Sequence, residues 1–501
     1  MTINWLRKNG LMAAIGLGLA LSITSCDKKF EELNTDPNNA YTTSTSYLLT
    51  NAEKNMMDLT WDEWFNSRRG NQLAQYWSSN TYSNESRYQF RIGITNNYWN
   101  LFYANSLKDL QEIIALNTGE TAPNYIRFGK NENQIAIAKI LQSWLFQNIT
   151  DCWGPIPYDE AFQGPENFYP AYNSQEEVYT RLLAALNEAI ALIDESDNTV
   201  AGDVIYGGNM TQWKKFANSL KMRVALRMAD TNLAGEAQAA FEAAAPNSFT
   251  SNADNAIYSY LSTNPNINPQ AEDYQTRNDF AASNTMVDEL SRLNDPRIGI
   301  YYEPAVATGT FVGEVYGLSE ANAGQTSSSS VSQRGQSVLA TDAPGVYLDY
   351  AQVCFMKAEA VARGWGLSGT AKDHYNAGIE SSMDYWNDGS VTAADISNYI
   401  AQAEVDYDTL MANGETWQQI IGRQKWIALY MQGVQGWAEW RRLDFGILQL
   451  PADGPLDGTG IPNRMKYPLD EQTLNAESYA DGVAKLGGID NQDTKLWWDV
   501  N

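Results

Sequence analysis

The sequence has 501 residues, of which 44% are apolar and 19% charged. This composition is typical of a globular chain and excludes a disordered or fibrous one, and the length alone suggests about three domains. Acidic residues number 60 against 34 basic ones, a formal charge of -26, which argues against a broad nucleic-acid interface because phosphate backbones are repelled. His374 is the single histidine, so the chain cannot build a multi-histidine zinc site, and imidazole chemistry rests on one residue.

The first 25 residues have the pattern of a lipoprotein signal peptide. Arg7 and Lys8 precede an apolar run over residues 11–21, which is too short for a membrane span of about 20 residues. The following Ile-Thr-Ser-Cys stretch resembles a bacterial lipobox, so we expect cleavage before Cys26 and acylation of its thiol. The alternative is ordinary secretion with a free thiol. Because residues 1–25 carry two basic and no acidic side chains, the mature charge becomes -26 - 2 = -28.

Two further cysteines, Cys152 and Cys354, lie about 200 residues apart and give no disulfide framework signature. In an oxidising compartment they can pair. The apolar stretch around Cys354 instead favours a buried, inert thiol.

Helical periodicity recurs along the mature chain. Apolar residues share one face over 137–149 and over 174–193, and the latter begins with a capping box at Ser174 and Glu177. Further helices are predicted over 98–117, 210–230, 346–363, 371–387 and 415–431. Turns containing Gly and Pro separate most of them, so neighbouring helices are expected to pack as hairpins in a mainly α fold.

Residues 247–345 have a different composition, rich in Asn, Ser, Thr, Gly and Pro. One helical patch is predicted near 281–293, and the rest indicates loops with short strands. A stretch of this length inside a compact chain is usually functional or disordered. We therefore expect one domain over 26–501, with a helical scaffold carrying a loop-rich lobe at about 247–345.

Three enzyme-like features have simpler explanations. Residues 364–369 match the dinucleotide pattern G-x-G-x-x-G, but they follow a predicted helix, where Gly364 is placed as a helix C-cap. His374 lies on a predicted helix with no nucleophile at a recognisable spacing, which favours a structural role. A glycosidase needs only two suitably placed carboxylates. Among 60 acidic residues such a pair can always be chosen, so the requirement does not distinguish a glycosidase from other proteins here.

The segment 61–88 mixes aromatic residues with amide and hydroxyl side chains. Aromatic rings stack on the C–H face of a sugar, and Asn, Asp, Arg or Gln bond its hydroxyls, although peptides use similar side chains. A tryptophan that recurs at the spacing of a helix face is more often a buried core residue than a ligand-binding one. Trp77 and Tyr82 are the better candidates here because they adjoin a polar, turn-like stretch.

A series of short motifs runs along the mature chain. They are Leu33–Asn38, Asp151–Tyr158, Trp213–Arg223, Asn294–Arg297, Ala358–Gly364, Gln424–Leu429, Trp440–Arg442 and Arg464–Pro468 with Glu471 and Asn475. Each motif is weak alone, but in this order they resemble the SusD/RagB family of nutrient-binding outer-membrane lipoproteins of Bacteroidetes, in its SusD-like branch, and the order makes the resemblance specific.

The resemblance implies tetratricopeptide-like helical hairpins that support an irregular, ligand-binding lobe. It also implies a partner, a SusC-like TonB-dependent barrel, over which the lipoprotein sits as a lid that traps oligosaccharide and breaks no bond. The expected location is the outer membrane, lipid-anchored and facing the exterior. Glu31 and Glu32 partly resemble a surface-export signal, but Lys28 and Lys29 interrupt the acidic pattern. The expectation that the protein faces the cell exterior therefore depends on the family resemblance.

Most of these motifs are expected to be scaffold, with Arg464 and Glu471 as a structural ion pair around a turn. The family offers no transferable ligand motif. The predicted ligand-binding residues are Trp77, Asn80, Tyr82, Arg87, Arg277, Asn278, Asp279 and Tyr301. Arg and Asp would bond ring hydroxyls or the charged termini of a peptide.

Three other functions stay open at this stage. The same lid can take short oligopeptides, the chain can be a two-carboxylate surface glycosidase, or it can be a structural partner without a ligand. No cofactor is predicted, and a structural calcium ion stays possible because oxygen ligands leave no spacing signature here. The mature charge favours neutral or basic ligands unless a local basic pocket overrides it.

Overall fold

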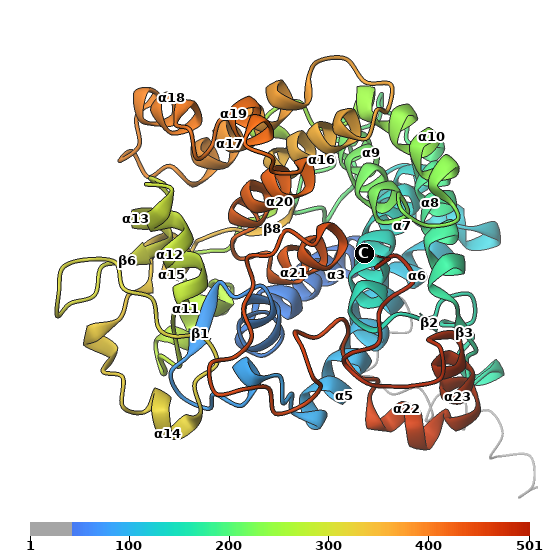
Figure 1. Ribbon diagram of the computed structural model, residues 1–501. Helices are drawn as coiled ribbons and strands as arrows, with labels where there is room; N and C mark the ends of the chain where they lie inside the picture. The colour runs from blue at the N-terminus through green and yellow to red at the C-terminus, as the bar shows by residue number, and fades with distance from the viewer. Residues whose placement is uncertain (1–42, 501) are drawn as a thin grey trace, which may run out of the picture. The chain divides into compact units, whose positions relative to one another are not determined.

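Helices dominate the computed structural model, which describes residues 43–500 (Figure 1). The α-helices are α3 (Thr45–Trp61), α4 (Asn71–Leu73), α5 (Ile92–Leu101), α6 (Lys108–Leu116), α7 (Asn131–Trp153), α8 (Gln175–Leu192), α9 (Met210–Arg227), α10 (Ala234–Ala244), α11 (Pro269–Tyr274), α12 (Asn284–Arg292), α13 (Ile298–Tyr301), α14 (Glu320–Ala323), α15 (Gln336–Leu339), α16 (Tyr350–Ala362), α17 (Ala371–Trp386), α18 (Ala393–Ala401), α19 (Tyr407–Ala412), α20 (Trp417–Ala428), α21 (Gly433–Leu443), α22 (Leu469–Leu474) and α23 (Ala476–Lys485). Two π-helical turns, η1 (Glu63–Gly70) and η3 (Phe102–Leu107), continue neighbouring helices.

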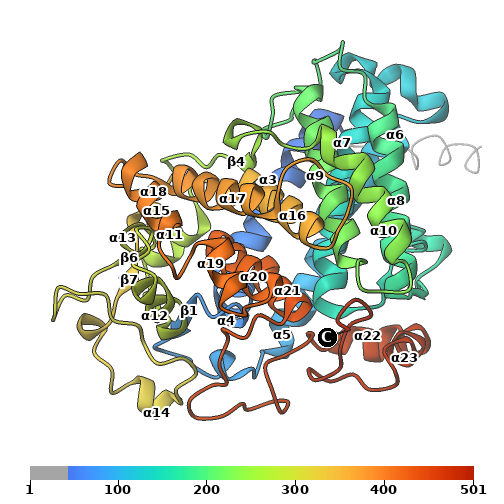
Figure 2. The same cartoon turned by 45° about the horizontal axis from the view of Figure 1, so that its top comes forward.

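The long helices pack as successive hairpins, which confirms the mainly α, tetratricopeptide-like scaffold. Helix α7 packs against α8, α8 against α9 and α9 against α10, and a second set joins α16 with α17 and α20. Figures 1 and 2 show α7 to α10 side by side. The capping box predicted at Ser174 and Glu177 opens α8, and a second box at Thr370 and Asp373 opens α17. Side-chain caps satisfy amides that a helix start otherwise leaves unpaired.

The predicted helices lie where periodicity placed them, with two informative differences. The segment expected over 98–117 is α5, η3 and α6 in succession, from Ile92 to Leu116. The helix expected from residue 346 begins at Tyr350, because Gly345–Leu348 forms strand β8 and pairs with β4 (Ala256–Tyr258). An apolar run of this kind is consistent with both a buried strand and a buried helix.

The region 247–345 is the loop-rich lobe that composition predicted, drawn in yellow tones in Figure 1. It contains short helices and two-residue to four-residue strands, among them β5 (Phe280–Ala282), β6 (Tyr302–Glu303) and β7 (Gln333–Arg334). Strand β1 (Trp77–Ser79) pairs antiparallel with β5, with Ser79 opposite Phe280. The other pair, β2 (Ile156–Pro157) with β3 (Tyr172–Asn173), lies in the scaffold. The β1–β5 pair therefore joins the segment around 61–88 to the lobe.

Charged residues of the sequence motifs form ion pairs inside the scaffold. Glu359 accepts from Arg442 at 2.6 Å, and Arg442 also donates to Glu439 at 2.6 Å. The Lys425 ammonium lies 2.9 Å from Glu439. All four side chains are buried, and buried charges are tolerated when they are paired and hydrogen-bonded.

One predicted ion pair is wrong. Arg464 Nη1 donates to Asp490 Oδ1 at 2.6 Å, whereas Glu471 accepts from the Tyr172 hydroxyl at 2.7 Å. Glu471 lies in the first turn of a separate helix, α22, and the carboxylate of Asp490 reaches Arg464 from a later loop. Sequence proximity did not determine the partner.

The predictions for Cys354, for residues 364–369 and for His374 agree with the structure. Cys152 and Cys354 are both buried and unpaired, and burial raises the pKa of Cys354 to about 11. Residues 364–369 form the turn between α16 and α17, and Gly364 has the positive φ of +82° that a C-cap glycine adopts. His374 Nε2 lies 2.9 Å from the carbonyl oxygen of Ser368, a local structural contact. Cys26, the charged residues 28–32 and the Leu33–Asn38 motif all lie outside the described residues.

Candidate ligand-binding site

The candidate site is built on the π-helical turn η1, which follows α3. Asp62 caps this turn by accepting a hydrogen bond from the Phe65 amide at 2.8 Å. Burial of the Asp62 carboxyl raises its pKa to about 7. π-Helical turns are frequent at functional sites, and this one places Trp64, half-buried, beside Arg68, fully buried.

Arg68 is the centre of a buried ion network. Its Nε lies 2.8 Å from Glu63 Oε1, its Nη1 3.4 Å from Glu85 Oε2, and its Nη2 2.7 Å from Asp279 Oδ2. The three carboxylates come from η1, from the turn after β1 and from the residue before β5. Burial lowers the tendency of Arg68 to be charged, but these carboxylates outweigh it and raise the pKa of its guanidinium. The network therefore holds three separate chain segments together.

Tyr82 lies above this network with its ring open to solvent. Tyr82 is 48% exposed, and its backbone has a φ of +56°, a left-handed conformation that bulky residues rarely adopt. The guanidinium carbon of Arg277 lies 5.0 Å from the ring centroid, that of Arg91 lies 5.6 Å away and that of Arg68 lies 5.8 Å away. These cation–π contacts hold the exposed ring in place.

A cavity of about 660 Å³ opens beside Tyr82. Phe90, Arg91 and Glu85 contribute to its lining, and Glu320 reaches it from α14. Glu320 Oε2 accepts from the Ser83 amide at 2.8 Å, which fixes the loop that carries Tyr82. The cavity thus combines aromatic rings with guanidinium and carboxylate groups, the chemistry that binds an amphipathic ligand such as a sugar or a peptide.

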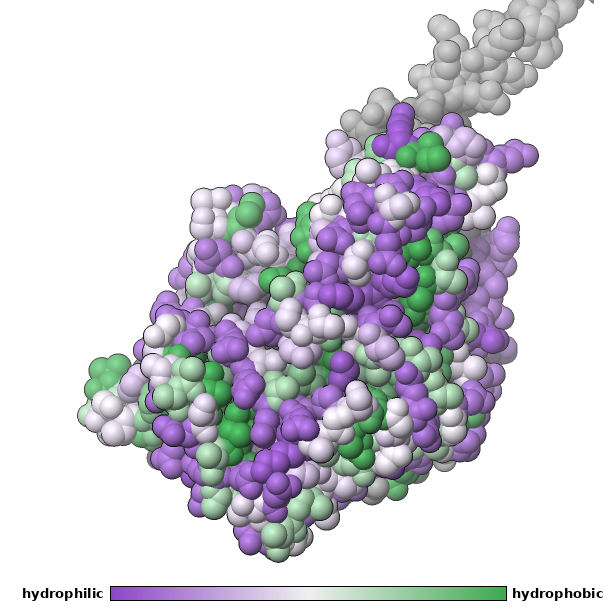
Figure 3. Space-filling view, turned by 90° about the horizontal axis from the view of Figure 1, so that it is seen from above, coloured by the Kyte–Doolittle hydropathy of each residue, from purple (hydrophilic) through white to green (hydrophobic). Residues whose placement is uncertain are grey.

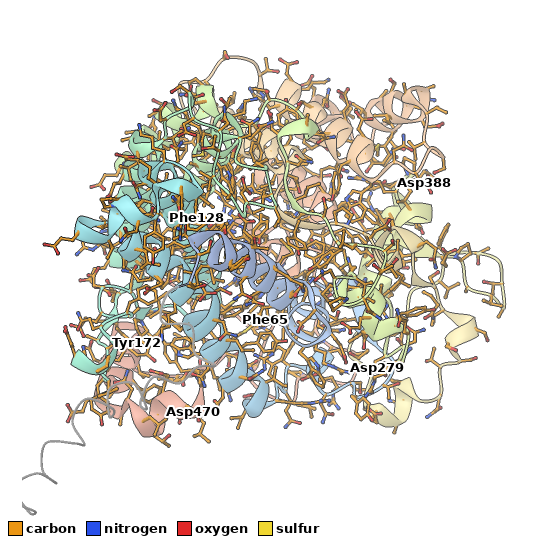
Figure 4. The ribbon with its side chains drawn as sticks, turned by 180° about the vertical axis from the view of Figure 1, so that it is seen from behind. Phe65, Phe128, Tyr172, Asp279, Asp388 and Asp470 are labelled. Carbon is orange, nitrogen blue, oxygen red and sulfur yellow. The ribbon has the colours of Figure 1, made fainter. Side chains whose placement is uncertain are left out.

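The structure brings several predicted residues together at this site. The backbone N–H of Asn80 donates to the backbone carbonyl oxygen of Asp279 at 3.0 Å, extending the β1–β5 pairing. Arg277 Nη2 lies 2.6 Å from Asp279 Oδ2. Asn278 lies at the edge of the group, donating to Gln333 Oε1 at 2.7 Å. In Figure 4, Asp279 lies with the loop-rich lobe, and Tyr172 and Asp470 lie on the other side of the view.

Two other predicted residues are fully buried, and a third, Arg87, is half-buried and bonded to a different loop. Trp77 is fully buried on β1, and its Nε1 donates to the Tyr430 hydroxyl at 3.0 Å. Tyr301 is also fully buried, with its ring stacked on Tyr430 at a centroid distance of 4.1 Å. Arg87 points to a different loop, where its Nε donates to the Gly454 carbonyl oxygen at 2.8 Å. These side chains support the core and a loop.

Sequence reasoning missed Trp64, Arg68 and Arg91. Trp64 lay within the aromatic segment 61–88, where a half-buried ring could not be distinguished from a core ring. The signal for Arg68 was the pair Arg68-Arg69, two adjacent cations beside aromatic residues in an acidic chain. Arg91 had no signal of its own.

Neither a metal cluster nor a membrane-spanning helix is found in the described part of the chain. Within residues 43–500, no group of three or more His, Cys, Asp or Glu side chains is arranged to hold a metal ion. No helix within the same range is long and apolar enough to cross a membrane. On the face drawn in Figure 3, apolar residues lie in small groups among polar ones, as on an ordinary water-exposed surface.

Comparison with known proteins identifies relatives over most of the chain. Residues 37–468 match the model of the SusD-like family described as starch-binding and associating with the outer membrane. A SusD homologue from Bacteroides uniformis shares 27% sequence identity at a TM-score of 0.77, covering 91% of this chain and 100% of its own. A second homologue, from Bacteroides ovatus, shares 25% identity at a TM-score of 0.75, covering 91% of this chain and 99% of its own.

A chitin-binding SusD homologue from Flavobacterium johnsoniae has the same fold, with 24% identity and a TM-score of 0.76, covering 90% of this chain and 99% of its own. Curated protein sequences gave no match. The family model spans well over half of the sequence, and the chain therefore belongs to the SusD-like family of outer-membrane-associated nutrient-binding proteins.

Proposed function

We propose that this protein captures oligosaccharide on the cell surface at the Tyr82 site and serves as the lid of a SusC-like TonB-dependent barrel. The observation that carries the proposal is Tyr82 itself, a 48% exposed ring held in a left-handed backbone conformation beside a cavity of about 660 Å³. A bulky residue in this conformation costs on the order of 1–3 kcal/mol and persists only where the surroundings impose it.

The chemistry around Tyr82 suits a sugar. The exposed ring offers an apolar face for C–H groups, and Arg91 and Arg277 offer N–H donors to ring hydroxyls. Their side chains are 42% and 39% exposed, respectively. Glu320 is exposed, lines the same cavity and supplies acceptors, whereas Glu85 in the same lining is buried against Arg68. A sugar hydroxyl both donates and accepts, so a mixed set of this kind serves it better than a set of one polarity.

The lid role and the location rest on family membership and on the signal sequence. Family members associate with the outer membrane, and acylation of Cys26 would anchor this chain there. In this proposal the protein binds and releases its ligand without breaking a bond. Incubation with a bound oligosaccharide should leave its chain length unchanged, and the accumulation of shorter products would support the glycosidase alternative instead.

Calorimetric titration of soluble protein starting at residue 27 tests the ligand class. The panel contains neutral α-1,4-glucan and chitin oligosaccharides and a pool of protease-digested peptides. We expect saturable binding of at least one oligosaccharide that is weakened in Tyr82→Ala. Binding of peptides alone would reject the sugar ligand. Affinity capture from a membrane extract of the native host tests the lid role separately, since a barrel partner should co-purify.

A further inference from the structure

The helical scaffold carries a groove of about 520 Å³ that is separate from the Tyr82 site. Its lining comes from the continuous helical segment α5, η3 and α6 and from the loop 158–171. None of its lining residues lines the cavity beside Tyr82. In Figure 4, Asp470, the neighbour of the lining residue Glu471, lies across the view from Asp279 of the Tyr82 site. The volume is within the range of roughly 300–1,000 Å³ that small-ligand sites have.

Phe168 lines this groove with a ring that is open to solvent. The residue is 72% exposed, and hydrogen bonds fix the loop on both sides of it. Asn167 Oδ1 accepts from the Tyr169 amide at 3.0 Å, and Asn167 Nδ2 donates to Glu160 Oε2 at 2.8 Å. The Ala171 amide donates to the same Glu160 oxygen at 2.8 Å. Because the loop is already ordered, a ligand that stacks on the ring loses less free energy to ordering the protein.

Three half-buried rings add to this aromatic surface. Tyr103 and Phe162 line the groove, and Phe162 also lines an adjoining cavity of about 320 Å³ together with Tyr158. All three pack on the buried ring of Phe146, at centroid distances of 6.1 Å for Tyr103, 6.1 Å for Phe162 and 4.5 Å for Tyr158. The Tyr103 hydroxyl donates to the Pro157 carbonyl oxygen at 2.8 Å. The rings are thus fixed on one support and leave part of each surface open to the C–H face of a sugar.

Accessible charged groups border the rings. Lys108 and Glu112 lie one turn apart on α6, both exposed, and neither side chain forms an ion pair or hydrogen bond with another residue of the described range 43–500. The third charged lining residue, Glu471, is half-buried and accepts from the Tyr172 hydroxyl at 2.7 Å. One cation against two carboxylates does not favour an acidic ligand. Free donors and acceptors beside aromatic rings suit the hydroxyls of a neutral sugar.

We propose that this groove is a second binding site for neutral oligosaccharide, with Phe168 as its exposed stacking platform and Lys108 and Glu112 as partners of the sugar hydroxyls. This inference rests on the proposed function and extends it from one site to two. Short oligosaccharides occupy the two sites independently, because the sites share no lining residue. A glycan that is long enough to reach both sites is held more tightly than by either site alone.

Hydrogen–deuterium exchange read by mass spectrometry tests the two sites separately. Soluble protein starting at residue 27 is titrated with maltotriose or with N-acetylchitotriose. We expect at least one of them to slow exchange over residues 158–171 in a saturable manner, and Phe168→Ala to raise the half-saturating concentration about tenfold because the stacking surface is lost. Phe168→Tyr keeps a ring and should keep the protection. Tyr82→Ala should leave protection of 158–171 unchanged, as should Tyr47→Ala, which removes an equally exposed ring that lines neither cavity of the groove.

Exchange over 158–171 that neither sugar slows, or protection that is unchanged in Phe168→Ala, would overturn the inference. Sugar-dependent protection over residues 77–92 in that case would leave the proposed function intact, whereas no protection of either segment would reject both. A membrane protein captured from the native host that protects 158–171, with no protection by sugar, would identify the groove as a protein interface and would also overturn the inference.

Discussion

The guanidinium of Arg277 lies 5.0 Å from the ring centroid of Tyr82 and at the same time places Nη2 2.6 Å from Asp279 Oδ2. One side chain therefore connects an exposed aromatic ring to the buried network around Arg68. Because Asp279 precedes strand β5, which pairs with β1, the ring and its support come from segments about 200 residues apart. The Tyr82 site exists only in the folded chain.

Replacement of the exposed ring tests this arrangement first. Tyr82→Ala should weaken oligosaccharide binding about tenfold, equivalent to about 1.4 kcal/mol, because the stacking surface is removed. The melting temperature should change little, since the ring is 48% exposed. Tyr47→Ala removes a tyrosine that is 74% exposed on α3 and serves as the matched control. Unchanged affinity in Tyr82→Ala would exclude the ring from the site.

The buried network should dominate the local stability. Arg68→Met leaves Glu63, Glu85 and Asp279 without their shared cation, and breaking a buried ion network of this kind costs about 3–5 kcal/mol. Urea denaturation measures the loss. Arg127→Met removes an exposed arginine and should change the free energy of unfolding by less than about 0.5 kcal/mol. A similarly small effect of Arg68→Met would show that the carboxylates find other partners.

Glu314 should make stability depend on pH. It is buried in the lobe, its carboxylate oxygens accept no hydrogen bond from the described residues, and burial raises its pKa from 4.5 to about 7. Since the folded-state pKa is the higher one, the protonated form favours folding. That stability is complete below about pH 4.5 and is lost as the pH rises through 7.

Glu314→Gln keeps the shape of the side chain and replaces the carboxyl group with an amide that does not titrate. We expect the variant and the wild type to unfold at similar urea concentrations at pH 4, and the variant to gain on the order of 3 kcal/mol relative to the wild type at pH 8. Other raised carboxyls, such as Asp62, affect both proteins equally and cancel in the difference. A difference that does not change between pH 4 and pH 8 would contradict a buried, titrating Glu314.

The lipid anchor depends on one thiol. In a bacterial host with lipoprotein processing, the full chain should incorporate labelled palmitate and sediment with membranes, whereas Cys26→Ala should do neither. Cys152→Ala removes a buried, unpaired cysteine and should remain acylated. Membrane association that persists in Cys26→Ala would point to attachment by another route, and the account of the anchor would then be wrong.

The fold was largely predictable because its helices carry strong amphipathic periods and local caps. Tyr82, Asn80, Arg277 and Asp279 were also predictable as a group, since each lies in a polar stretch outside the periodic segments. That they lie together follows from the β1–β5 pairing, which no local pattern specifies.

The side chains that point away from the Tyr82 cavity, and the different partner of Arg464, have the same origin. Trp77 was predicted to face a ligand because its neighbours are polar, but pairing on β1 turns it into the core beside Tyr430. Arg87 was predicted at the site, but its donors reach the carbonyl oxygens of residues 453 and 454. Arg464 likewise finds Asp490 and not Glu471. In each case, a long-range contact determines the orientation of the side chain.

A crystal structure with a bound oligosaccharide, chosen from the titration panel, tests the central claim most directly. The account predicts a sugar ring stacked on Tyr82, with hydroxyls within hydrogen-bond distance of Arg91 or Arg277. The chain offers a second groove of about 520 Å³ lined by Trp99, Tyr103 and Phe168. Ligand density in that groove, with Tyr82 left exposed to solvent, would contradict the account.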